Sequence, residues 1–210
     1  MRPYRDPATF IARNMPLVAA SPGVRIHMAN PSSGLNRLLG DAAPAPYWAF
    51  AWAGGLALTR YMADHPSCVA GLRVLDFGAG SGLVGIAAAK AGAYAVTAAE
   101  TDPVGVVAIG LNAAANAVRI DVVADDITRG PVPKVDVVLA GDVFYDAALA
   151  GAVSGFFDRC VAQGVRVLVG DPGRAHLPLV RLRELARYPV ADFGEGAGAA
   201  GSSARVLAFA

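Results

Sequence analysis

The chain has 210 residues, of which 55% are hydrophobic and 17% are charged, and 18 basic side chains nearly balance 17 acidic ones. This length fits one domain, and the apolar content excludes a disordered chain. A net charge of +1 gives no electrostatic reason to expect nucleic acid or an anionic membrane as a partner. Two cysteines and no apolar signal segment at the N-terminus lead us to expect a cytoplasmic protein, and three widely spaced histidines give no metal site.

Residues 1–43 contain clusters of proline, serine and glycine, and we expect them to be irregular apart from a short helix near 35–40. The uncharged stretch 42–59 has the length of a membrane span, but prolines and paired glycines interrupt it. A helix is expected at about 54–64, ending before Pro66.

From residue 72 onward, short apolar strands alternate with helices. The expected strands are 72–76, 93–99, 120–124, 135–140, 165–169 and 204–210, and the expected helices are 82–92, 103–117, 147–162 and 177–188. The tract 195–203, rich in glycine, alanine and serine, is expected to be a loop joining two final strands. This alternation predicts an α/β fold with a parallel sheet covered by helices on both faces.

Acidic residues stand at the carboxyl ends of five consecutive predicted strands. They are Asp76, Glu100, Asp125, Asp142 and Asp171. One such acid is explained well enough as the cap of the next helix. Because the carboxyl ends of parallel strands meet at one edge of the sheet, five together favour a ligand rich in positive charge or hydrogen-bond donors.

The loop after the first of these strands, residues 76–82, reads DFGAGSG. Its glycines fit both G-x-G-x-x-G, the dinucleotide fingerprint, and D-x-G-x-G-x-G, the first motif of S-adenosylmethionine (SAM) methyltransferases. Charge separates the two, because the carboxylate of Asp76 would repel a pyrophosphate but attract the ammonium of SAM. We therefore expect Asp76 to face that ammonium, Glu100 the ribose hydroxyls and Asp125 the adenine amine, with loop N–H groups on the SAM carboxylate.

The loop after the fourth strand, residues 141–146, reads GDVFYD. Asp142 can accept a hydrogen bond from an approaching amine, and Tyr145 can offer an oxygen or a ring face to a methylammonium. The aromatic run 46–55 can supply the walls of such a pocket, and Trp52 either lines the cofactor site or belongs to the core.

Residues 44–175 resemble the seven-β-strand protein-lysine methyltransferases, in particular the group that modifies the electron transfer flavoprotein β subunit. The matching segments are 46–55, 74–82, 100–103 with Leu111, Asn112 and Asn116, 139–145, and 169–174. The combination of GDVFY with GDPGR is specific to this group. The resemblance implies the class I methyltransferase fold, a Rossmann-like, mostly parallel sheet of seven strands, in residues 46–210 after an N-terminal extension of residues 1–45.

The resemblance also implies SAM-dependent methylation of lysines on the flavoprotein β subunit. It assigns the substrate lysine to Asp142 and Tyr145. It assigns the cofactor to Trp52, Asp76, Gly78, Gly80, Glu100 and Asp125. The sequence departs from the family at its ends, where no Pro-Glu-Ile element follows Leu17-Val18 and the final hairpin is rich in glycine and alanine. These departures bear on the substrate more than on the cofactor.

Three other functions remain open. The same group often carries the label of a nicotinamide N-methyltransferase, so the acceptor could be a small amine or pyridine. A dehydrogenase would need a motif such as Tyr-x-x-x-Lys, and Leu149 stands where Tyr145 would require the lysine. A SAM-binding protein without activity is the last alternative. Methylation of DNA or RNA is disfavoured, because Arg181, Arg183 and Arg187 on one predicted helix are too few for a phosphate track.

Overall fold

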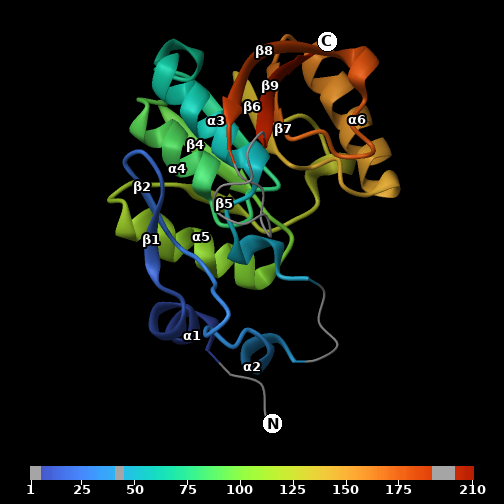
Figure 1. Ribbon diagram of the computed structural model, residues 1–210. Helices are drawn as coiled ribbons and strands as arrows, with labels where there is room; N and C mark the ends of the chain where they lie inside the picture. The colour runs from blue at the N-terminus through green and yellow to red at the C-terminus, as the bar shows by residue number, and fades with distance from the viewer. Residues whose placement is uncertain (1–5, 41–44, 191–201) are drawn as a thin grey trace.

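The computed structural model describes residues 6–40, 45–190 and 202–210. It contains a seven-stranded sheet in the order β5-β4-β3-β6-β7-β9-β8 and a separate two-stranded sheet (Figure 1). Strands β3 to β7 are parallel, and β9 runs antiparallel between β7 and β8. The strands are β3 (Arg73–Phe77), β4 (Ala95–Ala99), β5 (Asp121–Val123), β6 (Val137–Gly141), β7 (Arg166–Asp171), β8 (Leu182–Pro189) and β9 (Ser203–Phe209). The predicted fold class is confirmed.

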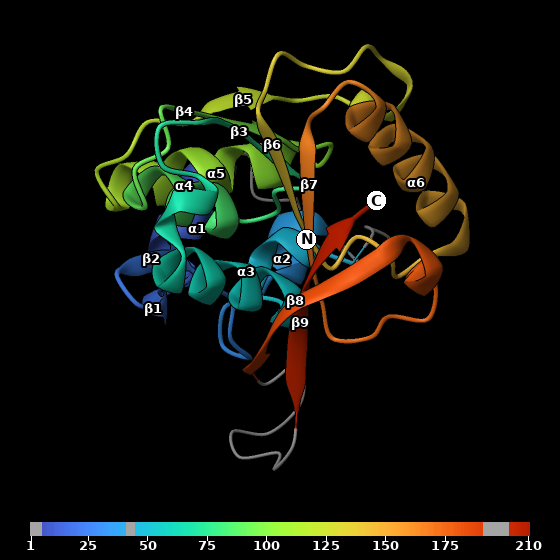
Figure 2. The same cartoon turned by 90° about the horizontal axis from the view of Figure 1, so that it is seen from above.

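Helices cover both faces of this sheet (Figure 2). They are α3 (Ala53–Asp64), α4 (Leu83–Lys90) and α5 (Pro103–Ala115) on one face and α6 (Ala147–Ala162) on the other. Strand side chains alternate between the two layers, so Leu75 and Phe77 of β3 pack toward α6 while Val74 packs toward α4. Asp76 has the same orientation as Val74, which turns its carboxylate toward the N-terminus of α4.

The N-terminal part is more regular than the sequence predicted. It forms α1 (Pro7–Asn14), an antiparallel hairpin of β1 (Leu17–Ser21) and β2 (Val24–His27), and α2 (Asn36–Leu39). The amides of His27 and Arg25 on β2 donate to the side-chain oxygens of Asn112 (2.7 Å) and Asn116 (3.0 Å) on α5. The expectation of an irregular segment was therefore wrong, because the hairpin is anchored by amide side chains that lie far away in sequence.

The helix predicted at 177–188 is also wrong. A 3-10 turn at Leu179–Arg181 leads into β8, which pairs along its length with β9, from Leu182 opposite Phe209 to Tyr188 opposite Ala204. Arginine, leucine, glutamate and alanine favour a helix locally, but pairing with β9 overrides that weak preference. On this edge strand Arg187 forms an ion pair of 2.9 Å with Glu184. Of the predicted loop 195–203, residues 195–201 lie outside the described residues.

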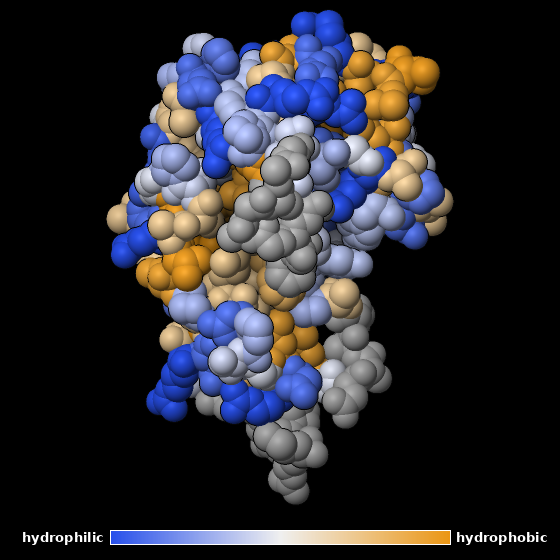
Figure 3. All heavy atoms as spheres, viewed as in Figure 1, coloured by the Kyte–Doolittle hydropathy of each residue, from blue (hydrophilic) through white to orange (hydrophobic). Residues whose placement is uncertain are grey.

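Most of the surface visible in Figure 3 is polar. An apolar area lies at the upper right of this view. In the segment leading into β8, Leu179 and Val180 are exposed. Within the described part of the chain, no helix combines the length and apolar character needed to cross a membrane.

Candidate active site

A cavity of about 370 Å³, counted to its open mouth, lies where the carboxyl ends of β3 and β6 meet the start of α3. Five of the predicted site residues line it: Trp52, Asp76, Gly78, Gly80 and Asp142. The structure thus brings together the glycine loop, two of the strand-end acids and the aromatic run, as the sequence predicted for a site at this edge of the sheet.

Asp76 is buried at the floor of this cavity, with 1% of its surface exposed. Its Oδ2 accepts a hydrogen bond of 2.7 Å from the amide of Gly85, in the first turn of α4. Burial raises the pKa of Asp76 to about 7, although the Gly85 bond opposes the shift, and the nearby Glu100 adds to it. Asp76 therefore has both roles expected of an acid at a strand end. It caps the helix α4, and it presents a buried carboxyl group that a cationic ligand would keep ionised.

Glu100 fastens the glycine loop to the end of β4. Its Oε2 accepts from the amide of Gly80 (2.6 Å), and its Oε1 accepts from the amides of Thr101 and Asp102 (both 2.8 Å). Three of the roughly four lone-pair positions of the carboxylate are thus used, and one on Oε2 remains. Glu100 also lies against α5, where a Cβ on Gly105 would approach its Cγ to 3.0 Å.

Asp125, like Glu100, is not among the residues lining the cavity. Its side chain is exposed, and its Oδ1 accepts from the amide of Asp126 (2.8 Å). Its role toward the adenine amine stays a prediction.

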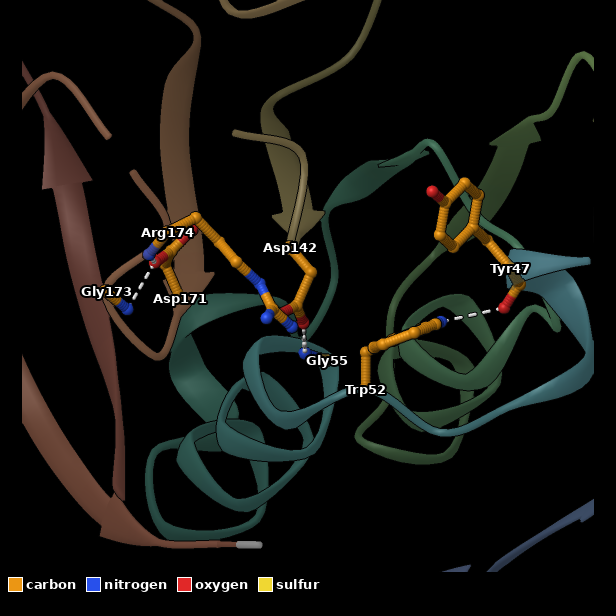
Figure 4. Close-up of polar contacts among 7 residues, drawn as sticks. All are labelled: Tyr47, Trp52, Gly55, Asp142, Asp171, Gly173 and Arg174. Atoms are coloured by element: carbon orange, nitrogen blue, oxygen red, sulfur yellow. Dashed lines mark hydrogen bonds and ion pairs between the residues drawn. The ribbon is translucent and has the colours of Figure 1, made fainter. Parts of the chain in front are cut away.

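Asp142 is held by three hydrogen bonds from two other elements (Figure 4). Its Oδ2 accepts from the amide of Gly55 in the first turn of α3 (3.1 Å). Its Oδ1 accepts from Nη2 (2.8 Å) and Nε (3.2 Å) of Arg174, in the loop after β7. The helix α3 has no side-chain cap of its own, so Asp142 supplies one from the neighbouring strand.

The backbone and surroundings of Asp142 are also unusual. Its φ is +56°, in the left-handed region that few residues other than glycine, asparagine and aspartate adopt. Its amide donates to the carbonyl of Gly170 (2.9 Å), and the residue is 7% exposed. Burial raises the pKa of Asp142 to about 6, the guanidinium of Arg174 opposes that rise, and the carboxyl group of Asp171 reinforces it.

Aromatic rings stand at the mouth of the cavity. The ring of Tyr47 lies 5.1 Å from that of Tyr145 and 5.7 Å from that of Trp52, measured between centroids. The indole Nε1 of Trp52 donates to the carbonyl of Tyr47 (2.7 Å), as Figure 4 shows. Tyr47 and Tyr145 are each about half exposed, so their ring faces are accessible from outside.

The site contains three residues that the sequence did not single out: Arg174, Tyr47 and Gly55. Each belongs to a segment that carried the resemblance, yet nothing in the local pattern showed that Arg174 would meet Asp142. Asp171 explains how it does so, because its Oδ1 accepts from the amides of Gly173 (2.6 Å) and Arg174 (2.7 Å) and holds the loop in a tight turn.

A seven-stranded sheet of this order, with a glycine loop after β3 and a cavity at the carboxyl ends of β3 and β6, defines a class I SAM-dependent methyltransferase. The magnesium protoporphyrin IX methyltransferase of Synechocystis, solved with bound SAM, has the same fold: TM-score 0.53, 16% identity, covering 73% of this chain and 76% of that one. Residues 62–145 match the ribosomal protein L11 methyltransferase (PrmA) family.

Relatives of higher identity define the family. The electron transfer flavoprotein beta subunit lysine methyltransferase of Xenopus laevis is 37% identical over 180 residues, covering 82% of this chain and 73% of the frog protein. The enzyme of the same name from Rattus norvegicus is 39% identical over 153 residues, 70% of this chain and 60% of the rat protein. The chain belongs to the family of electron transfer flavoprotein β-subunit lysine methyltransferases.

Proposed function

We propose that this methyltransferase transfers methyl groups from SAM to the ε-amino groups of lysines on the electron transfer flavoprotein β subunit. The names of its relatives support that substrate. The observation that carries the proposal on the chain itself is the Asp142 carboxylate, which borders the cavity and keeps one lone-pair position unused by Gly55 and Arg174. A neutral amine can donate to that position.

The residues around the cavity fit the cofactor. Bound SAM supplies an activated methyl group. The buried carboxyl group of Asp76 can face its ammonium, and the free position on Oε2 of Glu100 can accept from a ribose hydroxyl. Gly78 and Gly80 have φ values of +64° and +54°, which turn the loop back on itself and leave no side chain between the backbone and the ligand. We keep Trp52 as a wall of this site and Asp125 as the predicted partner of adenine.

The chain must also prepare the amine. A lysine attacks only after losing its proton, and a pocket walled by apolar rings lowers its pKa because the charged form is poorly solvated there. The half-exposed rings of Tyr47 and Tyr145 can receive the methylene chain, and a cation over either ring would be attracted to its face. The displaced proton leaves through the open mouth. Positioning of the amine in line with the methyl group is then the main catalytic task.

A small acceptor such as nicotinamide is the second candidate. An enzyme for a small molecule benefits from a cap that closes over the substrate. Among the described residues, the two tyrosines at the mouth are open to solvent, which favours a long side chain reaching in from a protein.

We also propose a cytoplasmic location, supported by two buried cysteines, Cys68 and Cys160, that are both free thiols.

Intact-mass spectrometry tests the proposal. The flavoprotein β subunit from the same organism is incubated with SAM and the enzyme, and nicotinamide is offered in a parallel reaction. We expect the β subunit to gain whole methyl groups, and to gain them about 100-fold more slowly or not at all when Asp142→Asn replaces the wild type. Methylated nicotinamide without methylated protein would reverse the choice of acceptor.

A further inference from the structure

The loop that follows β7 reaches into the site at the end of the neighbouring strand β6. Arg174 extends from this loop to the carboxylate of Asp142, 32 residues earlier in the chain (Figure 4). Two of its nitrogens, Nε and Nη2, donate to the same oxygen, Oδ1. Its guanidinium carbon also lies 5.7 Å from the centroid of the Trp52 ring, at the aromatic wall of the cavity.

This contact decides how the carboxylate of Asp142 can be used. Oδ1 has both lone pairs directed at Arg174, while Oδ2 has one directed at Gly55. Counting the donors from the part of the chain that the structure describes, one position is left, on Oδ2. Arg174 thus fixes the rotation of the carboxylate and determines which oxygen can receive a substrate amine.

Arg174 also sets the charge around Asp142. The charged and titratable groups around Asp142 come from several elements. They are Arg174 in the loop after β7, Asp171 at the end of β7, Asp76 at the end of β3, and the hydroxyl groups of Tyr47 and Tyr145 at the mouth. Arg205 on β9 acts on Asp171. Among these groups Arg174 is the cation in direct contact with Asp142, at 2.8 Å, and its side chain is itself 23% exposed.

We propose that Arg174 is a positioning residue for methyl transfer: it keeps Asp142 ionised and turned so that one lone pair of Oδ2 faces the substrate amine. This inference rests on the proposed function for its kinetic consequence, but the contact between the two side chains can be tested without any substrate.

The charge balance has a consequence for the nucleophile. A lone carboxylate beside the lysine would stabilise its ammonium form and so raise the pKa of the very group that must be neutral. A carboxylate already paired with a guanidinium accepts the hydrogen bond of the amine while holding the ammonium less strongly. Arg174 therefore acts on the reaction through Asp142 and needs no contact with the methyl group.

A titration of the free enzyme tests the contact. The ¹³C resonance of the Asp142 carboxyl carbon, identified by its loss in Asp142→Asn, is followed against pH by NMR. We expect a midpoint near pH 6 in the wild type, a midpoint at least one pH unit higher in Arg174→Gln, and a value between the two in Arg174→Lys, which restores the charge but not the paired donors. An unchanged midpoint in Arg174→Gln would overturn the proposal.

Kinetics test the consequence. In the wild type, log kcat/KM for the β subunit should show a lower break near pH 6, and in Arg174→Gln that break should move upward with the NMR midpoint while the Kd for SAM stays within threefold. The matched control is Arg187→Gln, which breaks an ion pair with Glu184 on the exposed edge strand and should leave both measurements unchanged. A uniform loss of rate with an unmoved break would show a merely structural role.

The two proposals can fail separately. If the wild type methylates no protein lysine, the proposed function is wrong, and the NMR titration still decides the role of Arg174. If the wild type is active and the titration of Arg174→Gln is unchanged, only the inference on Arg174 is wrong. Should Arg174→Gln not fold, Arg174→Lys is read in the same way, with a raised midpoint supporting the proposal and an unchanged one overturning it.

Discussion

Gly54 of α3 and Gly170 of β7 approach each other so closely that neither position has room for a side chain. A Cβ on Gly54 would lie 2.1 Å from the carbonyl oxygen of Gly170, and a Cβ on Gly170 would lie 2.0 Å from the carbonyl oxygen of Gly54. The same Cβ on Gly54 would come within 2.5 Å of Oδ2 of Asp142. This contact sets the start of α3 against the sheet and brings the amide of Gly55 within reach of Asp142.

The first prediction concerns this contact. Gly54→Ala should destabilise the protein by about 3 kcal/mol or more, because two backbones must separate to admit one methyl group. For a chain of this size, that corresponds to a fall in Tm of roughly 6–12 °C by calorimetry. The matched control is Gly151→Ala, at an exposed position of α6 where a Cβ would meet nothing within 4 Å. It should stabilise the helix by up to about 1 kcal/mol, and equal effects at the two positions would contradict the prediction.

The second prediction concerns Asp142. Asp142→Asn should lower kcat by about 100-fold or more, since the amide cannot accept from Gly55, Arg174 and an amine together, while the Kd for SAM changes little. Asparagine tolerates the left-handed backbone at this position, so the fold should persist. Kinetics and calorimetry measure the two quantities. Asp146→Asn in the same loop is the control, because asparagine can replace Asp146 as the cap of α6. An active Asp142→Asn enzyme would remove the role assigned to this carboxylate.

The third prediction separates two of the acids at the strand ends. Glu100→Ala should weaken SAM binding by about 10- to 100-fold, because the cofactor loses a charged acceptor and the loop at Gly80 loses its anchor. Asp125→Ala should weaken binding less, since the Asp125 side chain is exposed, whereas Glu100 accepts from the amide of Gly80, a residue that lines the cavity. Isothermal titration calorimetry gives both values. Equal losses would show that Asp125 meets the cofactor as closely as Glu100 does.

The fourth prediction concerns pH. The pKa of Asp76 is raised to about 7 by burial, so at pH 6 the group is mostly protonated and at pH 8 mostly ionised. A ligand ammonium beside it favours the ionised form, so SAM should bind more tightly as pH rises from 5.5 to 7.5 and should release protons on binding near pH 7. Calorimetry in buffers of different ionisation enthalpy counts these protons. Asp76→Asn should bind SAM weakly at every pH, and a wild-type affinity independent of pH would contradict the assignment.

The raised pKa of Asp76 also makes the free energy of unfolding depend on pH. The folded protein binds a proton at Asp76 over the interval between the ordinary pKa of 3.8 and about 7, where the unfolded chain does not. The contribution of this residue to the free energy of unfolding therefore falls as pH rises through that interval. The buried carboxyl group is tolerated at neutral pH because the rest of the core stabilises the fold, which is typical of groups kept for binding.

Much of the central fold could be predicted because its signals are local. Short apolar strands, the glycine loop and the spacing of the helices each depend on residues near one another in sequence. Predicting where the strand-end acids lie required only one further rule, that parallel strands present their carboxyl ends at a common edge of the sheet. The predicted placement of Asp76 and Asp142 at one cavity follows from that rule.

The sequence predictions were wrong where partners distant in sequence decide the local structure. β8 carries residues that suit a helix, and only the neighbouring β9 makes it a strand. The hairpin β1–β2 depends on Asn112 and Asn116, and nothing near it in sequence indicates those bonds. In both cases a weak local preference lost to hydrogen bonds that the chain forms only when folded.

The sequence by itself determined the class of fold, the cofactor loop and the residue types at the edge of the sheet, since these follow from periodicity and from the charge of a few side chains. Tertiary structure alone decided that Asp142 would be buried, that it would cap α3 through Gly55, and that Arg174 would occupy one of its oxygens. The physical reason is that burial and ion pairing depend on which elements the sheet brings close together. The spacing of residues along the chain does not indicate those contacts.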